Sequence, residues 1–524
     1  FNNAKFEYVC VVNRFHWRPT AAVAAKRNGT PADVELLLKL IETWINDNPI
    51  PIDVVEGEAG FWPYWYKAWA PLNTALRAKN WLFTLHLLWD SHSLTAERFG
   101  VILKSLRQHL IWGGLISPRA DKAAGGNHFL METESLLFLS TLPWLKESVS
   151  AREAALANLA RCINNQVLPD GAHCEKTPGY HRGCMLWYGL PILLCKLNQW
   201  PIPDELVNRV YSMVNFGLYM VQPDGVLTAS GDNSRTNDAW SAEWFLSKMA
   251  NRELPIPAQP TGGAYRYVRN WPEPSQSAPT VFPLAIRFPD AGFAIARNSW
   301  KNDASSLHIK LDGYGGAHSH ADFLGVKYCY KGRLMIDEQG THSYNNDATA
   351  VGCKMAMAHS VLLLGNRDMF SFEKLNYYWD GKPCVKISEV VCTTHFDGSM
   401  QTGARINWDE HTWWQRNFDF NAKTGGLVLR DQIAVAQPEP VRIQFYVFST
   451  KVELVGNCGI RTTDIGLPNI ALAVNGAPAG TTIKITSAVS YNGFFKSIPV
   501  SLVTFHIPAC TTGTWETRIG IASA

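Results

Sequence analysis

Residues 313–322 read GYGGAHSHAD and place His318 and His320 one residue apart, behind a glycine-rich approach. An imidazole has a reference pKa near 6.5, so it can transfer protons at neutral pH, and it is also a common metal ligand. Two such side chains share one face on a strand but can diverge in a loop. The pair therefore allows three interpretations: one site, two different sites, or a polar loop.

A carboxylate and a further histidine follow at fixed steps from this pair. Asp337 stands 17 residues after His320, and His359 stands another 22 residues on. Two neutral imidazoles and a carboxylate form a common zinc set, which leaves one position for water. The spacing alone is a weak signal, and Asp322 can serve as a ligand or as an orienting partner of one.

The stretch GGNHFLMETESLL (125–137) places Asn127 and His128 at the start of an amphipathic segment. Polar side chains at a helix N-terminus lie in positive potential and can meet an anionic group. The alternative is an N-cap at Asn127 with a solvated His128, and this stretch alone favours the alternative.

The stretch PDGAHCEKTPGYHRGCMLWYG (169–189) is a polar loop before an aromatic helical segment. A tyrosine hydroxyl has a reference pKa near 10, so Tyr180 can shuttle protons only where neighbours stabilise its phenolate. His181 and Arg182 are placed to do so. In isolation, an exposed loop tyrosine is the simpler interpretation. The same loop carries Asp170, His173 and Glu175.

The composition limits the class of protein. With 524 residues, 46% of them hydrophobic and 18% charged, the chain is an ordinary folded protein of about two domains. A net charge of +3 without a basic run argues against nucleic acid but is compatible with a groove for an acidic polymer. The 20 tryptophans are a weak hint of carbohydrate, although most such rings are core.

Several other classes lack support. The 11 cysteines form no CxxC pair, which disfavours zinc-finger and thioredoxin sites and indicates mostly buried thiols. No apolar stretch reaches the roughly 18–20 residues that cross a bilayer. The usual motifs of serine hydrolases, phosphate-binding loops, dinucleotide-binding folds and zinc proteases are missing. Phe1 is neither an initiator methionine nor the start of a signal peptide, so we expect a processed or trimmed N-terminus.

Two halves with different hydrophobic periods must position these residues. The first half repeats apolar residues every three or four positions, which predicts helices over 32–49, 72–90, 96–115, 134–145, 151–167 and 203–221. A ring of antiparallel helix pairs around a groove, an α/α toroid, fits this pattern. The second half has a period of two, which predicts strands within 293–299, 305–311, 325–337, 385–392, 426–435, 441–449 and 481–487.

A stretch rich in proline, glycine and serine separates the halves and reads as a linker. We therefore predict a helical domain over 1–250, a linker over 251–282 and an antiparallel β-sandwich over 283–524. The fold class is α+β and multidomain.

In this order, the stretches resemble the heparinase II/III superfamily of polysaccharide lyases. NRFHWRPTAAVAAKRNGTPADVELLLKLIETWINDNP and GFWPYWYKAWAPLNTALR look like its toroid domain. GGNHFLMETESLL and PDGAHCEKTPGYH look like two active-site loops, and GGAHSHADFLGVKYCYKGRLMIDEQGTHSYN looks like the start of its β-sandwich. The resemblance covers nearly the whole chain and is specific for the superfamily but much less so for the substrate.

The resemblance implies an incomplete (α/α) toroid followed by an antiparallel β-sandwich. It also implies β-elimination on a uronic-acid polysaccharide, in which a base removes the C5 proton and an acid assists the departure of the oxygen at C4. Asn127, with His128, would neutralise the substrate carboxylate, because the intermediate gains negative charge there. Tyr180 and His318 would be the proton-transfer pair.

The resemblance further implies a structural metal, which we take to be zinc, on His320, Asp337 and His359. His342 is the nearest competitor for the third position. No organic cofactor is expected. The resemblance and the loop composition together name further candidate substrate contacts: Glu175, His181, Arg182, Arg235 and Trp240.

Heparin or heparan sulfate is the favoured substrate, and alginate, hyaluronan, chondroitin sulfate and other uronans remain alternatives. The resemblance places such an enzyme in the periplasm or outside the cell. A glycoside hydrolase is a second possibility and would need two carboxylates across the groove, for which Glu132, Glu134 and Glu175 are available. A non-catalytic polysaccharide-binding protein is a third, and the oligomeric state stays open.

Overall fold

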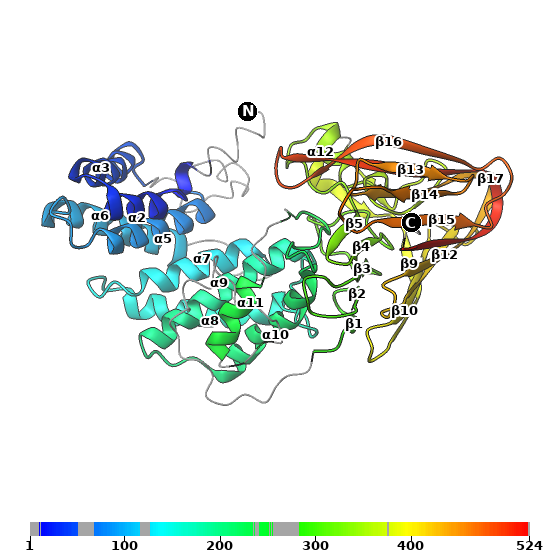
Figure 1. The fold of residues 1–524 in the computed structure, drawn as a ribbon. Coiled ribbons are helices and arrows are strands. Elements are labelled where there is room, and N and C mark those ends of the chain that lie inside the picture. Colours follow the sequence, from blue (N-terminus) through cyan, green and yellow to red (C-terminus); the bar gives the residue numbers. More distant parts are fainter. Residues whose placement is uncertain are drawn as a thin grey trace. The chain divides into compact units, whose positions relative to one another are not determined.

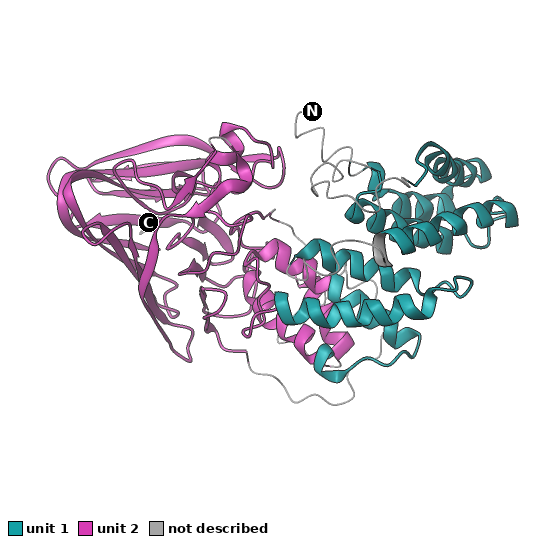
Figure 2. Cartoon of the chain, turned by 180° about the vertical axis from the view of Figure 1, so that it is seen from behind, with its two compact units in different colours: residues 1–166, 187–207 teal, residues 167–186, 208–524 magenta. Residues whose placement is uncertain are grey.

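The computed structural model describes residues 10, 12–50, 68–115, 126–233, 235, 240–250, 252, 254, 282–374 and 377–521. Helices occupy the first half of the chain and strands the second, as the change of hydrophobic period predicts (Figure 1). The chain packs as two compact units (Figure 2): unit 1 holds residues 1–166 and 187–207, and unit 2 holds 167–186 and 208–524. The predicted domain limits stay a prediction, since most of 251–282 lies outside the described residues.

Five of the six predicted helices agree with the structure to within three residues at each end, and the helix predicted over 134–145 does not. The described helices are α2 (Arg18–Asn28), α3 (Pro31–Asp47), α5 (Pro71–Leu87), α6 (Ala96–His109) with the π-helical turn η2 (Leu110–Leu115), α7 (Asn127–Leu139), α8 (Ser148–Gln166), α9 (Pro178–Leu197), α10 (Asp204–Met220) and α11 (Ser241–Ala250). Helix α7 begins seven residues before its predicted start, because it is buried on almost every side and lacks an amphipathic period. No helix in the described part of the chain is long and apolar enough to cross a membrane.

Three buried tryptophans of unit 1, Trp44, Trp69 and Trp81, lie in its core. The rings of Trp44 and Trp81 pack edge to face at 5.4 Å, and the Arg77 guanidinium lies 3.7 Å from the Trp44 ring. Arg77 Nε donates to His109 Nε2 at 2.9 Å, and burial keeps the pKa of His109 well below its usual value. These rings serve the helical core, where α5 packs against α2 and α7, and α7 against α8.

The strands of unit 2 pair antiparallel throughout the described residues. They are β1 (Ala285–Phe288), β2 (Phe293–Arg297), β3 (Ser306–Lys310), β4 (Lys327–Tyr330), β5 (Arg333–Asp337), β6 (Leu362–Leu364), β7 (Phe370–Phe372), β8 (Gly381–Pro383), β9 (Lys386–Thr394), β10 (Met400–Asn407), β11 (Trp413–Phe420), β12 (Leu427–Val447), β13 (Val452–Val455), β14 (Gly459–Thr462), β15 (Ile470–Asn475), β16 (Thr482–Tyr491) and β17 (Ser497–Ile521). The sheet runs β1-β2-β3-β4-β5-β12-β17-β15-β14-β13, and β11, β10 and β9 continue from β12. Two short helical turns, α12 (Ala348–Gly352) and η4 (Ala356–Ala358), follow β5, and a third, η5 (Tyr378–Asp380), precedes β8.

Strand β12 joins two runs that the sequence predicts as separate strands. Its pairing with β17 shifts register between Ala434 and Val441. Pro438 and Pro440 lie within that interval, and a proline cannot donate to a ladder. The strand therefore continues through a local irregularity, and no turn forms there.

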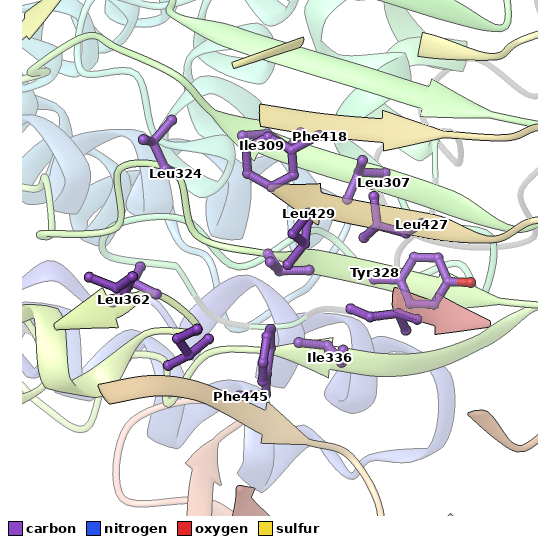
Figure 3. Close-up of a cluster of buried hydrophobic side chains, with 14 of the residues drawn as sticks. Leu307, Ile309, Leu324, Tyr328, Ile336, Leu362, Phe418, Leu427, Leu429 and Phe445 are labelled. Atoms are coloured by element: carbon purple, nitrogen blue, oxygen red, sulfur yellow. The ribbon is translucent and has the colours of Figure 1, made fainter. Parts of the chain in front are cut away.

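The core of unit 2 lies between β3 on one side and β11 and β12, which do not pair with β3, on the other. Leu307 and Ile309 of β3 share one buried cluster with Phe418 of β11 and Phe445 of β12 (Figure 3). A sheet that folds over itself around a shared apolar layer is a β-sandwich.

Helix α10 belongs to unit 2 because its aromatic face packs against the first strands of the sheet. The Phe216 ring meets the rings of Phe288 and Phe293 edge to face at 5.2 and 5.5 Å. His308 Nε2 on β3 lies 2.8 Å from the carbonyl oxygen of Tyr219. This packing fixes the loop after α10, which supplies part of the site, against the sheet.

Candidate active site and metal-ligand cluster

Tyr180 and His318 lie face to face in unit 2. Tyr180 is in the first turn of α9, and His318 is in the loop between β3 and β4. Their rings stack with centroids 3.9 Å apart and planes 26° apart. The Tyr180 hydroxyl lies 2.9 Å from the Tyr344 hydroxyl, and the His318 side chain is 15% exposed. Two residues chosen from separate motifs are thus in contact.

Glycines bring the three loops of this site together. Gly231 has φ +63°, and a Cβ there would lie 2.6 Å from the His318 carbonyl oxygen. The next residue, Asp232, donates its backbone N–H to that oxygen at 2.9 Å. A Cβ on Gly315 would lie 2.0 Å from the Glu175 carbonyl oxygen. The loops around residues 175, 231 and 315 therefore pack backbone to backbone, which only glycine allows at these points.

Asp232 connects the two histidines of the opening stretch. Its Oδ2 lies 2.7 Å from His318 Nδ1, and its Oδ1 lies 2.8 Å from His320 Nε2. The Tyr378 hydroxyl also donates to Oδ1. Burial by itself would raise the pKa of Asp232, but the Lys354 ammonium and the hydrogen bonds from both histidines hold it well below its usual value. Asp232 is not among the site residues predicted from the sequence.

These contacts set the proton on His318. Because Nδ1 faces an ionised carboxylate, it must carry the N–H, and Nε2 is the nitrogen that can exchange a proton. The Trp379 ring meets the His318 ring edge to face at 5.4 Å. Burial raises the pKa values of the nearby Tyr344 and Tyr378 phenols well above normal, so both are neutral donors.

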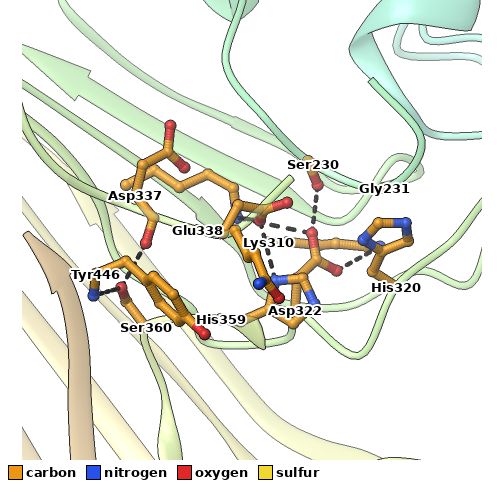
Figure 4. A network of polar contacts seen from close by, with 12 residues as sticks. Ser230, Gly231, Lys310, His320, Asp322, Asp337, Glu338, His359, Ser360 and Tyr446 are labelled. Carbon is orange, nitrogen blue, oxygen red and sulfur yellow. Dashed lines mark hydrogen bonds and ion pairs between the residues drawn. The ribbon is translucent and has the colours of Figure 1, made fainter. Parts of the chain in front are cut away.

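A buried cluster of His320, Glu338 and His359 has the geometry of a metal site (Figure 4). One potential ligand atom from each lies within 4.8 Å of the others. His320 Nδ1 and both ring nitrogens of His359 make no hydrogen bond within the described residues, and His359 Nδ1 lies 3.2 Å from Glu338 Oε2. Unbonded imidazole nitrogens facing a buried carboxylate suit zinc, so the residues present fit the implied metal.

The ionisation of the cluster also suits a cation. Burial lowers the pKa of His320, which keeps its imidazole neutral. Burial alone would raise the pKa of Glu338, but Lys327 and His359 lower it to about 2. A neutral imidazole and an ionised carboxylate are the forms that coordinate zinc.

The carboxylate of this cluster is Glu338, whereas Asp337 was predicted. The Asp337 carboxylate pairs with Arg235 at 2.8 Å. Neighbouring residues at the end of an extended strand point to opposite sides, so one of these two acids faces the histidines and the other faces away. His342, the predicted competitor, packs against the rings of Tyr491 and Phe495.

Two lysines lie beside the cluster, because β3 ends, β4 begins and β5 ends next to it. Lys310 ends β3, Lys327 begins β4, and Glu338 follows β5. Lys327 Nζ lies 2.9 Å from Glu338 and 3.6 Å from Asp322. Lys310 Nζ lies 2.9 Å from Asp322, which also accepts a hydrogen bond from Ser230. Asp322 is therefore a partner of lysines beside the cluster (Figure 4).

The structure gives most predicted substrate contacts an internal role. His181 is 1% exposed, accepts from the His173 backbone N–H at Nδ1 and bonds the Met213 carbonyl through Nε2. Both ring nitrogens are thus used by the backbone, and burial lowers its pKa to about 4. Arg235 is buried with Asp337 and stacks on Phe448.

The remaining candidates differ in exposure. The Trp240 indole is buried and lies 3.4 Å from the Leu218 carbonyl oxygen, and Arg182 is buried with Nη2 at 3.2 Å from Ser241. Only Glu175 keeps a partly exposed side chain, at 18%.

Asn127 and His128 open helix α7 in unit 1, seven residues before the start of the helix predicted over 134–145. Asn127 is buried and is the first helical residue, preceded by Gly126 as the N-cap. Their part in the chemistry stays a prediction. Glu134, one of the acids considered for a hydrolase, is buried in the same unit and pairs with Lys79 at 2.6 Å.

Family models match both halves of the chain. Residues 7–254 match the model of the heparinase II/III N-terminus, and residues 283–494 match the heparinase II/III-like C-terminal model. The chain belongs to the heparinase II/III family. Both catalytic candidates of unit 2 lie inside the matched ranges, Tyr180 in the first and His318 in the second.

Individual relatives of this heparinase II/III chain are distant. A heparin-sulfate lyase of Bacteroides stercoris is 23% identical over 330 residues, which cover 61% of this chain and 47% of that protein. The chain spans about half the length of the curated relatives it matches. A heparinase III crystal structure has TM-score 0.77 at 15% identity, with 98% of this chain and 77% of that chain covered.

Solved structures of other polysaccharide lyases also have a similar fold. A chondroitin AC lyase of Streptomyces coelicolor A3 has TM-score 0.60 at 12% identity, over 98% of this chain and 75% of that chain. The similarities confirm the predicted fold class, an incomplete (α/α) toroid followed by an antiparallel β-sandwich.

Proposed function

We propose that the chain is a polysaccharide lyase that cleaves a uronic-acid-containing glycosaminoglycan by β-elimination and leaves a 4,5-unsaturated uronate. The observation that carries this proposal is the stacked pair of Tyr180 and His318, with His318 held by Asp232. Two side chains that can each gain or lose a proton, side by side and partly exposed, supply the base and the acid that the elimination needs.

We assign His318 Nε2 as one proton carrier and the Tyr180 hydroxyl as the other, and the stacking of the two rings supports this assignment. One removes the C5 proton beside the substrate carboxylate, and the other protonates the C4 oxygen as the C–O bond breaks. Negative charge builds on the substrate carboxylate as the C5 proton leaves, so groups that neutralise it lower the barrier. Asn127 and His128 are our candidates for this neutralisation.

Heparan sulfate or heparin is the proposed substrate. The curated relatives bear the name heparin-sulfate lyase, and the net charge of +3 is compatible with a sulfated polymer. Other uronans, including alginate, hyaluronan and chondroitin sulfate, are the alternatives to test. Since such polymers lie outside the cytoplasm, we place the enzyme in the periplasm or outside the cell.

The cluster of His320, Glu338 and His359 would hold one zinc ion in a structural role. The ion would supply positive charge between the β-strand ends and join residues from three separate segments. The proton transfers belong to the protein's own side chains and not to the ion. His318 exchanges its proton at Nε2, which lies on the opposite side of its ring from Asp232.

The test is turnover of a uronan panel followed by ultraviolet absorbance of the conjugated product. Wild type should raise the absorbance with heparan sulfate, and Tyr180→Phe should reduce kcat by about 10²–10⁴-fold with folding intact. Tyr328→Phe is the matched control, because the buried Tyr328 hydroxyl donates to the Gly425 carbonyl away from the site. This substitution should leave kcat unchanged. Saturated sugars without absorbance, or a fully active Tyr180→Phe variant, would contradict the proposal.

A further inference from the structure

The Asp232 carboxylate bonds the side chains of both histidines of GYGGAHSHAD. Oδ2 accepts from His318 Nδ1 at 2.7 Å and Oδ1 accepts from His320 Nε2 at 2.8 Å. The two histidines thus belong to different sites that share one carboxylate. His318 stacks on Tyr180, and His320 faces Glu338 and His359.

We propose that Asp232 is a positioning residue that couples metal binding at His320 to the orientation and tautomer of the proton carrier His318. The proposal rests on the proposed lyase function for its kinetic part and on the ligand cluster for its metal part. In this role Asp232 acts through the two imidazole rings, which it bonds at His318 Nδ1 and His320 Nε2.

The bonding pattern of His320 supports this role. Its Nε2 is used by Asp232, and its Nδ1 makes no hydrogen bond and belongs to the cluster with Glu338 and His359. A ligating imidazole whose other N–H donates to a carboxylate is the usual arrangement around zinc, and that carboxylate fixes both ring and tautomer. Here the same carboxylate also fixes the ring of His318.

The surroundings allow Asp232 little freedom. Its side chain is fully buried, its backbone N–H donates to the His318 carbonyl at 2.9 Å, and Gly231 brings the two backbones into contact. The Tyr378 hydroxyl adds a third donor to the carboxylate. Because one carboxylate makes both bonds, a movement of the carboxylate that follows one histidine also changes the bond to the other.

An amide cannot replace this carboxylate. Asn presents one acceptor oxygen and one donor nitrogen, so in Asp232→Asn one imidazole N–H faces an N–H group. The ring affected must turn or change tautomer. Either outcome disturbs His318 or His320, and the coupling transmits part of the disturbance to the other.

The test compares Asp232→Asn with wild type in kcat, KM and zinc affinity, the last measured by competition with a chromophoric chelator in the full chain. We expect kcat to fall by about 10–100-fold, zinc affinity to fall by about 10–100-fold, and KM to stay within about threefold. Asp464→Asn is the control, because it breaks a half-buried ion pair with Arg333 at the far end of β5 and should leave all three values unchanged. Tyr378→Phe, which removes only one donor to Oδ1, should lower kcat and zinc affinity by a smaller factor and serves if Asp232→Asn does not fold.

The coupling itself is tested by stripping zinc with the chelator. Wild type should lose kcat on stripping, and Asp232→Asn should lose much less, because the link is already cut. Unchanged zinc affinity in Asp232→Asn, or equal losses on stripping in both chains, overturns the proposal. A wild-type chain that binds zinc but cleaves no uronan overturns the proposed function, and zinc affinity alone then decides whether Asp232 holds His320.

Discussion

The hydroxyl oxygens of Tyr180 and Tyr344 lie 2.9 Å apart, so one phenol donates a hydrogen bond to the other. Burial keeps Tyr344 protonated by raising its pKa well above normal. Tyr344 is therefore the natural donor whenever Tyr180 carries negative charge.

We predict that Tyr344→Phe lowers kcat by about 2–13-fold, because a hydrogen bond of this kind contributes about 0.5–1.5 kcal/mol. The loss should be smaller than that in Tyr180→Phe, and steady-state absorbance kinetics would compare the two. A Tyr344→Phe variant as inactive as Tyr180→Phe would make Tyr344 the proton carrier instead.

The two adjacent acids at the end of β5 should separate metal binding from stability. Glu338→Gln should weaken zinc binding strongly, because Glu338 belongs to the ligand cluster. Asp337→Asn should leave zinc affinity nearly unchanged and lower the free energy of unfolding by about 3–5 kcal/mol, because it leaves buried Arg235 without its partner. Chelator competition and denaturant unfolding measure the two quantities, and the reverse pattern would restore Asp337 as the ligand.

Gly231→Ala should damage both stability and turnover. A residue with a Cβ is strained at φ +63°, and the Cβ would meet His318 O and Thr177 Cγ2, each at 2.6 Å. Strain of this kind costs about 1–3 kcal/mol, and the shift needed to relieve the contact would move Asp232 away from His318.

Gly456→Ala is the control for Gly231→Ala, since Gly456 has φ +59° with nothing within 4 Å of the added Cβ. It should lower stability through backbone strain only and keep kcat unchanged. Equal effects of both substitutions on kcat would show that the close approach to His318 does not matter.

Acid should destabilise the fold partly through His181. Burial lowers the pKa of His181 from 6.5 to about 4 in the folded chain, so the unfolded chain binds the proton more tightly. The contribution of neutral His181 to the free energy of unfolding is fully present above pH 6.5. It is lost as the pH falls towards 4, and the loss is roughly 3 kcal/mol.

His181→Gln removes the group that takes up the proton, so the free energy of unfolding should fall less steeply as the pH is lowered. Denaturant unfolding at several pH values between 4 and 7 measures the change, and equally steep declines in both chains would exclude His181 as a source of the acid sensitivity.

The sequence predicts those parts of the fold and site that depend on a regular hydrophobic spacing or on a local motif. The change from helical to strand spacing gives the two halves, and Tyr180 and His318 stand in stretches with family resemblance. Asp232 could not be found in this way, because it lies 86 residues before His318 and only the packing of α10 on the sheet brings the loops together. The charged stretch GDNSRTNDAW contains Asp232, but the two residues predicted from it as substrate contacts, Arg235 and Trp240, are buried.

Glu338 shows a different limit. Spacing in the sequence is nearly the same for Asp337 and Glu338, and only the direction of each side chain at the strand end separates them. That direction depends on the register in which β5 pairs with β4 and β12. A shift of the register by one residue would turn each side chain to the opposite face.

Strand β17 has a consequence for any shortened chain. The match to the C-terminal family model ends at residue 494, and β17 begins at Ser497. Yet β17 pairs along β12 from Leu427 to Val447 and also carries β15 and β16. A chain cut at the end of the match would expose a long row of unpaired backbone groups on β12, and such open edges recruit other chains into aggregates.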